Sequence, residues 1–279
     1  MAGRHSGKFG IVDGHSLIQN WNLEHITSPA TSNPSNVPGG TMRTAGISDW
    51  SGSFQQNHGD PTVFPGDSLS FLGYTAPDSG VYDSVGTRFS GTAIVDSFNM
   101  VWSWDSGSLS IVNTVSFSGN DTGGLVQTTS AGAITDVSAD LTPTICDLKI
   151  EQGESESESP IANVTNITFN LTSANVGSAN SSTSCWVTRK AGNLDWTLAV
   201  TEEETDQLLT IGNLFRLKPY VTASKFWVLS WGRLESYSGL SVDRSSGEII
   251  SKTMNFAMTG HDGSDVGVIT KPTGGNLWP

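Results

Sequence analysis

The stretch RTAGISDW at residues 43–50 recurs as RKAGNLDW at residues 189–196. Sliding residues 43–74 along the chain by 146 positions, without a gap, brings eight identical residues into register. A shuffled sequence gives about two matches over this length, so the repeat is real. The pairs are Arg43/Arg189, Ala45/Ala191, Gly46/Gly192, Asp49/Asp195, Trp50/Trp196, Asp60/Asp206, Gly66/Gly212 and Tyr74/Tyr220. A tandem duplication predicts a pseudo-symmetric architecture, which is more typical of assemblies than of catalysts.

Weaker matches extend the repeat on both sides. Before the motif, Trp21-x-Leu23 matches Phe169-x-Leu171. After it, Phe98 matches Tyr237, and the pattern Gly119-x-Asp121 matches Gly260-x-Asp262. We therefore predict two domains, residues 1–121 and 146–262, joined by a linker at 122–145 and followed by a C-terminal tail at 263–279. Each copy is long enough to bury a core of its own.

Composition narrows the class of protein. Only 15% of the residues are charged, whereas Gly (31) and Trp (9) are abundant, which favours an all-β fold with many turns. A net charge of −13 argues against tight binding of phosphates, and is compatible with a surface over which nucleic acid slides. No apolar run reaches the roughly 18 residues of a membrane span, so we expect no membrane partner. Cys146 and Cys185 do not match in the repeat; we interpret them as free thiols, with a disulfide as the alternative.

Alternating apolar and polar residues predict strands throughout the chain. Strands are expected at 49–55, 92–104, 110–118, 163–172, 195–201, 225–237 and 248–259. One short helix is expected in each copy. Glu202–Leu209 has acids where a first helical turn favours them, with Gly212 just past its end. Asn57–Pro65 is its weaker counterpart.

Two long loops occupy matching places in the repeat. Thr27–Gly40 contains Pro34 and is rich in proline; Ser173–Ser184 contains Gly177 and consists mainly of small residues. Each joins the second strand of its copy to the motif strand. Loops longer than about 12 residues are usually functional or disordered. We expect these two to make contacts in an assembly, reaching the adjacent ring.

Candidate chemistry is sparse. The five histidines are scattered at His5, His15, His25, His58 and His261, with no metal or catalytic spacing among them. The acids between Glu151 and Glu158 lack the pattern of a calcium loop and fit a solvated hairpin tip. The Asp-Trp pairs of the repeat fit either sugar stacking or a buried Trp whose Asp pairs with Arg43 or Arg189, and we favour the core. We expect no enzymatic activity, cofactor or metal; a jelly-roll hydrolase has the least support.

The element order resembles that of the major tail, or tail tube, proteins of long-tailed, non-contractile bacteriophages. Residues Gly46–Ser51 and Gly192–Thr197 carry the resemblance, within two copies of a strand pair, a long loop, a motif strand, a short helix and a closing hairpin. It covers nearly the whole chain. The resemblance implies two tandem β-sandwich or barrel domains, and members with two domains form trimeric rings of pseudo-sixfold symmetry.

The resemblance also implies a role. Stacked rings would form a tube with an acidic channel for DNA passage during ejection. The expected partners are further copies of the chain, a tape measure protein and viral DNA held loosely in the lumen, and other tail proteins at the tube ends. The expected location is the virion tail, after assembly in the cytoplasm of a bacterial host. The alternatives are a distal tail or baseplate ring protein of the same fold group, and a carbohydrate- or receptor-binding β-sandwich that uses the tryptophans.

Overall fold

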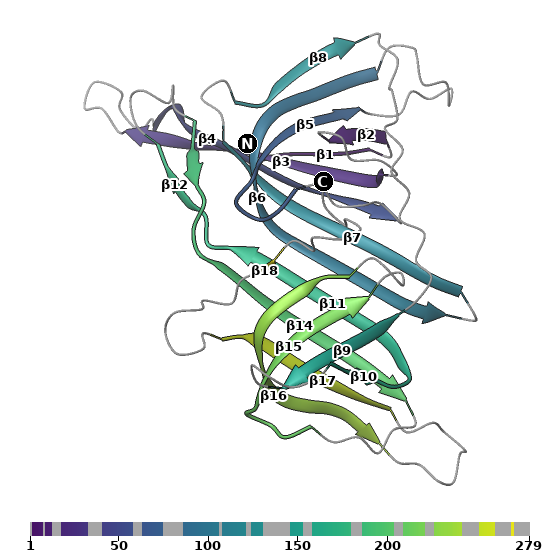
Figure 1. Ribbon diagram of the computed structural model, residues 1–279. Coiled ribbons are helices and arrows are strands. Elements are labelled where there is room, and N and C mark those ends of the chain that lie inside the picture. The colour runs from purple at the N-terminus through teal and green to yellow at the C-terminus, as the bar shows by residue number, and fades with distance from the viewer. Residues whose placement is uncertain are drawn as a thin grey trace.

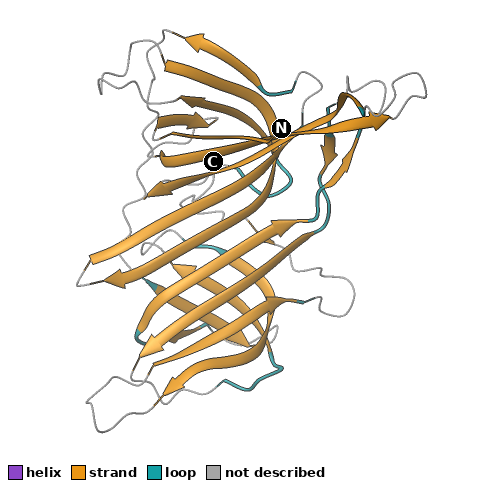
Figure 2. Cartoon of the chain, turned by 180° about the vertical axis from the view of Figure 1, so that it is seen from behind, coloured by secondary structure: helices purple, strands orange, loops and turns teal. Residues whose placement is uncertain are grey.

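The chain folds entirely from strands. The computed structural model describes residues 2–7, 9–12, 18–32, 41–57, 63–74, 86–105, 108–120, 124–130, 146–152, 158–179, 186–203, 209–220, 226–241, 251–259 and 269–270. These residues contain no helix (Figure 2). The all-β fold class expected from the sequence is therefore confirmed.

Strands β1 to β8 form the first copy of the repeat, and β9 to β18 form the second (Figure 1). The first copy contains β1 Ala2–Gly7, β2 Phe9–Val12, β3 Ile18–Ser32, β4 Met42–Asn57, β5 Ser68–Tyr74, β6 Gly86–Asp105, β7 Ser108–Gly119 and β8 Val126–Ser130. The second contains β9 Asp147–Gln152, β10 Ser159–Ile161, β11 Val164–Ser173, β12 Val176–Ser178, β13 Thr188–Lys190, β14 Leu194–Glu203, β15 Leu214–Tyr220, β16 Val228–Ser241, β17 Ser251–Met258 and β18 Ile269–Thr270.

The two copies have the same strand order. The first pairs in the order β3-β4-β7-β6-β5-β2, and the second in the order β11-β14-β17-β16-β15-β9, always antiparallel. β8 adds to β6 as β18 adds to β16. The segments expected to be a linker and a tail thus each contain a strand that belongs to the preceding copy. Both strands are short and lack a clear alternation of apolar and polar residues, so the sequence alone does not predict them.

The equivalence extends to single residues. Phe54 of β4 lies opposite Val115 of β7, and Val200 of β14 lies opposite Met254 of β17. Strand irregularities recur as well. β6 is irregular against β7 between Val95 and Ser97, and β16 is irregular against β17 between Leu234 and Ser236. The offset is 146 residues up to β5 and 139 in β6 and β7, since 200 − 54 = 146 and 254 − 115 = 139.

Two of the weaker sequence matches are wrong by two residues. Trp21 lies opposite Phe54, and the residue opposite Val200 is Ile167, so Trp21 corresponds to Ile167 rather than to Phe169. The offset of 139 likewise makes Met258, and not Gly260, the counterpart of Gly119 (119 + 139 = 258). The physical reason is that a strand repeats its pattern every two residues, so a slip of two leaves the apolar face intact.

The shared motif contributes to the packing of the core. Trp50 and Trp196 are both buried. A Cβ added to Gly46 would lie 1.6 Å from the carbonyl oxygen of Ser28, and one added to Gly192 would lie 1.7 Å from that of Ala174. Only glycine permits this approach of neighbouring strands, which explains why both copies keep it. The Trp residues therefore serve the core, as the sequence favoured, and do not form a stacking surface.

The expected helices are not supported. Glu202 and Glu203 belong to β14, because alternation continues through Leu198 and Val200 to a buried Glu202. Residues 204–208 and 58–62 lie outside the described residues, and Asn57 ends β4. Gly212 is a turn residue with φ of 90°, matched by Gly66 with φ of 94°, and caps no helix.

The expected loops are shorter than the sequence suggested. Thr27 lies in β3, Ser173 ends β11, and Gly177 lies in β12. Ser, Thr and Ala do not form an apolar and polar alternation, so the sequence does not show that the strands extend into these segments. Pro34, Gly40 and Ser184 lie outside the described residues.

Candidate assembly surface

The two copies join edge to edge. The second half of β6 pairs with β11, from Ser97 opposite Thr172 to Ser103 opposite Asn166. One antiparallel sheet therefore runs through both copies. Behind the junction, Phe98 of the first copy stacks on Trp227 of the second at a centroid separation of 6.0 Å, and Phe169 lies 5.1 Å from Trp227. The junction is thus both hydrogen-bonded and filled with aromatic side chains.

A second contact between the copies is made by a pair of strands that extends from the sheet, which we call an arm. The first arm consists of the paired residues Ala30–Ser32 and Met42–Thr44, and the second arm consists of their counterparts Val176–Ser178 and Thr188–Lys190. Both project on the same side of the molecule (Figure 1). At the base of the second arm, Asn175 donates to the Val95 carbonyl and to Asp96, each at 2.9 Å. The ring of Trp186 stacks on that of His25 at 5.4 Å. The described part of this arm therefore contacts the first copy of its own chain.

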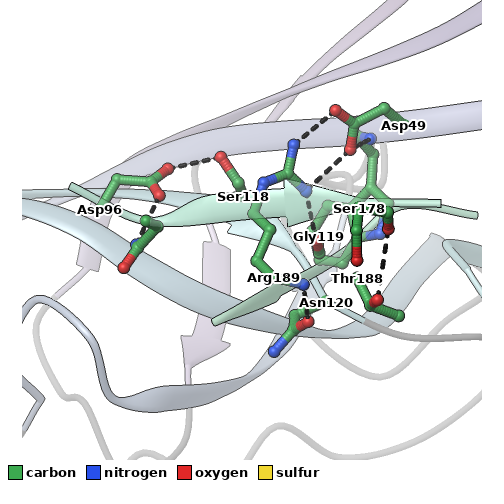
Figure 3. A network of polar contacts seen from close by, with 10 residues as sticks. Asp49, Asp96, Ser118, Gly119, Asn120, Ser178, Thr188 and Arg189 are labelled. Carbon is green, nitrogen blue, oxygen red and sulfur yellow. Dashed lines mark hydrogen bonds and ion pairs between the residues drawn. The ribbon is translucent and has the colours of Figure 1, made fainter. Parts of the chain in front are cut away.

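Arg189 is the centre of that contact (Figure 3). Its guanidinium binds the Asp49 carboxylate through two hydrogen bonds, with nitrogen–oxygen separations of 2.9 and 2.5 Å, and also donates to the Gly119 carbonyl. Its main-chain N–H donates to the side-chain oxygen of Asn120. All three partners belong to the first copy, and bidentate pairs of this kind are among the stronger polar contacts in proteins.

This pairing differs from the sequence-based interpretation, in which each Asp would pair with the Arg of its own copy. Arg189 binds Asp49 from the other copy, whereas Arg43 and Asp195 are exposed. Neither of these two forms an ion pair with another described residue. The local sequence could not reveal this, because the pairing depends on how the two copies meet.

The solvent side of the continuous sheet is polar and uncharged along its middle. We call it the polar face and define it by two rows of residues that lie opposite one another across successive strands. The first row is Asn20, Gln55, Thr114, Asn99, Asn170, Thr197 and Ala257. The second row is Ser110, Ser103, Asn166, Thr201, Thr253 and Ser238. Cross-strand hydrogen bonds link several neighbours, including Asn20 with Gln55 at 2.9 Å and Thr201 with Thr253 at 2.9 Å.

The acidic residues lie outside these two rows, although Asp195, two residues from Thr197 on β14, is exposed on the same side of the sheet. Glu158 pairs with Lys218 of β15, away from the polar face. Glu202 is on the buried side, where it pairs with Lys252 at 2.7 Å; the two side chains are 1% and 3% exposed. The matching positions of the first copy hold a buried Gln56 opposite a buried Asn113. The expected acidic bore thus has no acid in the two rows that define the polar face.

Tyr237 sits beside the buried ion pair. Its hydroxyl accepts from the Leu209 N–H at 2.6 Å and donates to the Leu209 carbonyl at 2.8 Å. Burial raises the pKa of Tyr237, the hydrogen bond to the Leu209 backbone opposes that rise, and the negative charge of Glu202 adds to it. The matching residue of the first copy is Phe98.

One strand edge has no partner in the described chain. β16 pairs with β15 as far as Arg233, Leu234 is hydrogen-bonded to Gly212 and Asn213, and beyond Leu234 this edge has no partner among the described residues. The matching edge of β6, in the first copy, is the one that pairs with β11. At the other end of the sheet, β1 covers β3 from Trp21 to Ile26, the residues that match the paired part of β11. Open edges invite pairing with further chains.

Features of other functions are few. The described residues contain no group of three or more His, Cys, Asp or Glu side chains placed to hold a metal ion. None of their elements is a helix long and apolar enough to cross a membrane. Cys146 is a buried free thiol, and Cys185 lies outside the described residues. Most described tryptophans are buried, whereas Trp104 is 45% exposed.

Among known proteins, no family model matches this sequence, and no curated protein matches it either.

Proposed function

We propose that this chain is the structural subunit of a bacteriophage tail tube, in which three copies close into a ring and the rings stack. The observation that carries the proposal is the junction of β6 with β11. It joins two equivalent halves head to tail and leaves the equivalent edge of β16 open. A junction between unlike edges is heterologous, and its repetition generates a closed ring or a filament.

The polar face supports the same role. Curving the sheet into a closed barrel removes its edges and places one face toward the lumen. Amide and hydroxyl side chains, largely engaged with one another, offer DNA phosphates no cation along the middle of this face, and the first row reaches an exposed Arg233 only at β16. The lumen is therefore proposed to be neutral along its middle, with the net charge of −13 repelling DNA at longer range. The tape measure protein would occupy this lumen before DNA does, with other tail proteins at the tube ends.

The alternative functions predict different assemblies or surfaces. A distal tail or baseplate ring protein would form single rings that never stack. A carbohydrate-binding module would present exposed aromatic side chains, whereas Trp50 and Trp196 are buried. No observation favours catalysis.

Negative-stain electron microscopy of the purified protein tests the proposal. The expected result is rings of threefold symmetry, or tubes built from them, when the protein is concentrated. Rings without tubes would favour the distal tail reading. Monomers that persist at the highest attainable concentration would refute a tube subunit.

A further inference from the structure

The chain contains one complete Arg–Asp junction and the two separated halves of another. Arg189 and Asp49 form the complete one, between the second and first copies. Arg43, in the first arm, and Asp195, in β14, occupy the matching places, and both are exposed. Because the copies are equivalent strand by strand, a second subunit placed as the copies are placed would bring these two halves together.

Part of the backbone of the receiving surface recurs in the second copy. In the first copy, the Gly119 carbonyl and the Asn120 side chain bind the Arg189 that pairs with Asp49, and the Asn120 N–H donates to the Thr92 carbonyl at 2.8 Å. In the second copy, the Thr259 N–H donates to the Trp231 carbonyl at 3.0 Å, at the same offset of 139 residues. One backbone hydrogen bond beside the motif strand thus recurs in the second copy, where Met258 and Thr259 replace Gly119 and Asn120.

The donating arm is formed as well. Arg43 lies opposite Thr31 in the first arm, as Arg189 lies opposite Gly177 in the second. Exposed apolar side chains accompany both halves of the incomplete junction. Ile47, near the first arm, is 49% exposed, and Leu194, beside Asp195, is 44% exposed. A second subunit that covers these side chains would remove their apolar surface from water.

We infer that Arg43 of one subunit binds Asp195 of the next, while β16 of that next subunit pairs with β3 of the first in the register of β6 with β11. This inference rests on the proposed ring and assigns its contacts. Ser97 of β6 pairs with Thr172 of β11, and Asn99 pairs with Asn170. Replacing each residue by its counterpart in the other copy places Ser236 opposite Ile26 and Ser238 opposite Glu24 of the neighbouring subunit. The partner is a second copy of this chain.

The register requires β1 to leave its place. β1 pairs with Trp21 to Ile26, the stretch of β3 that β16 of the neighbour would occupy. In a single subunit, β1 therefore covers an edge that would otherwise template uncontrolled pairing. Ring closure replaces the hydrogen bonds of β1 by those of the longer β16, so β1 acts as a removable cap.

Charge reversal tests the contact. Arg43→Asp and Asp195→Arg are each expected to weaken ring formation at least about tenfold, because like charges then face each other across the junction. The double variant R43D/D195R restores the opposite charges and is expected to assemble close to the original level. Lys190→Asp, an exposed reversal on the second arm, is the matched control and leaves assembly unchanged. Sedimentation velocity measures the ring fraction, and circular dichroism melts check that each variant is folded.

The outcomes separate the inference from the function it rests on. An original chain that forms no rings contradicts the proposed function and this contact together. Rings that tolerate both single reversals, or a double variant no better than the singles, overturn the contact alone. Deleting residues 2–7 provides a second readout: the deletion is expected to lower the concentration needed for rings, and an unchanged or higher threshold would overturn the capping role of β1.

Discussion

At two matching places on the buried side of the sheet, the copies differ in charge. Gln56 lies opposite Asn113 in the first copy, whereas Glu202 forms an ion pair with Lys252 in the second. The surrounding strand order is the same and one irregularity of β6 recurs in β16, although β16 has two more, against β17 between Ser238 and Ser241 and against β15 between Phe215 and Leu217. The strand arrangement that the copies share, here called the frame, therefore depends on the close strand approach at glycine and on the buried tryptophans. The buried polar pair can differ between the copies provided that both of its members change together.

The frame itself is tested by truncating the shared tryptophans. Trp50→Ala and Trp196→Ala are each expected to lower the free energy of unfolding by about 3–5 kcal/mol, since each removes a large buried side chain. Denaturant unfolding of the unassembled protein measures both. Trp104→Ala, at an exposed position, is the control and should cost less than about 0.5 kcal/mol. Strongly unequal losses at Trp50 and Trp196 would break the equivalence of the copies.

The buried polar pair of the first copy can be introduced into the second copy by two substitutions. Glu202→Gln alone leaves the Lys252 charge buried without its counter-charge and is expected to cost about 3–5 kcal/mol. The double change E202Q/K252N writes the first-copy pair into the second copy and should recover most of that loss. A double variant less stable than the single one would show that the two frames are not interchangeable. Equilibrium unfolding of the three proteins decides between these outcomes.

A smaller effect is expected where Tyr237 stands in place of Phe98. Tyr237→Phe removes the hydrogen bonds with Leu209 and should cost about 1 kcal/mol. Because the pKa of Tyr237 is raised in the folded chain, the unfolded chain loses its phenolic proton first. The contribution is therefore present below the ordinary tyrosine pKa of about 10 and is lost as the pH rises through the raised value. A stability difference between the two proteins that stays the same from neutral to alkaline pH would contradict this assignment.

The sequence predicted the parts of the structure that repeat and missed those that depend on neighbours. The motif, its buried tryptophans and the all-β class followed from identities and alternation. The Glu202 strand was mistaken for a helix because its partner, Lys252, lies 50 residues away, on another strand (252 − 202 = 50). β8 and β18 lie in segments without clear alternation, and only pairing with β6 and β16 defines them. The link of Arg189 to Asp49 depends on how the copies meet, which no local pattern encodes.

Covalent capture of neighbouring subunits tests the central claim most directly. Ile26→Cys and Ser236→Cys, in one chain with Cys185→Ser, are expected to lie opposite each other across the subunit boundary, within the reach of a disulfide. Under mild oxidation, denaturing non-reducing electrophoresis should show dimers and trimers and no larger species, because three chains close the circle. Either single cysteine alone is the control. A ladder that continues beyond three chains, or no cross-link at all, would contradict two equivalent copies closing a threefold ring.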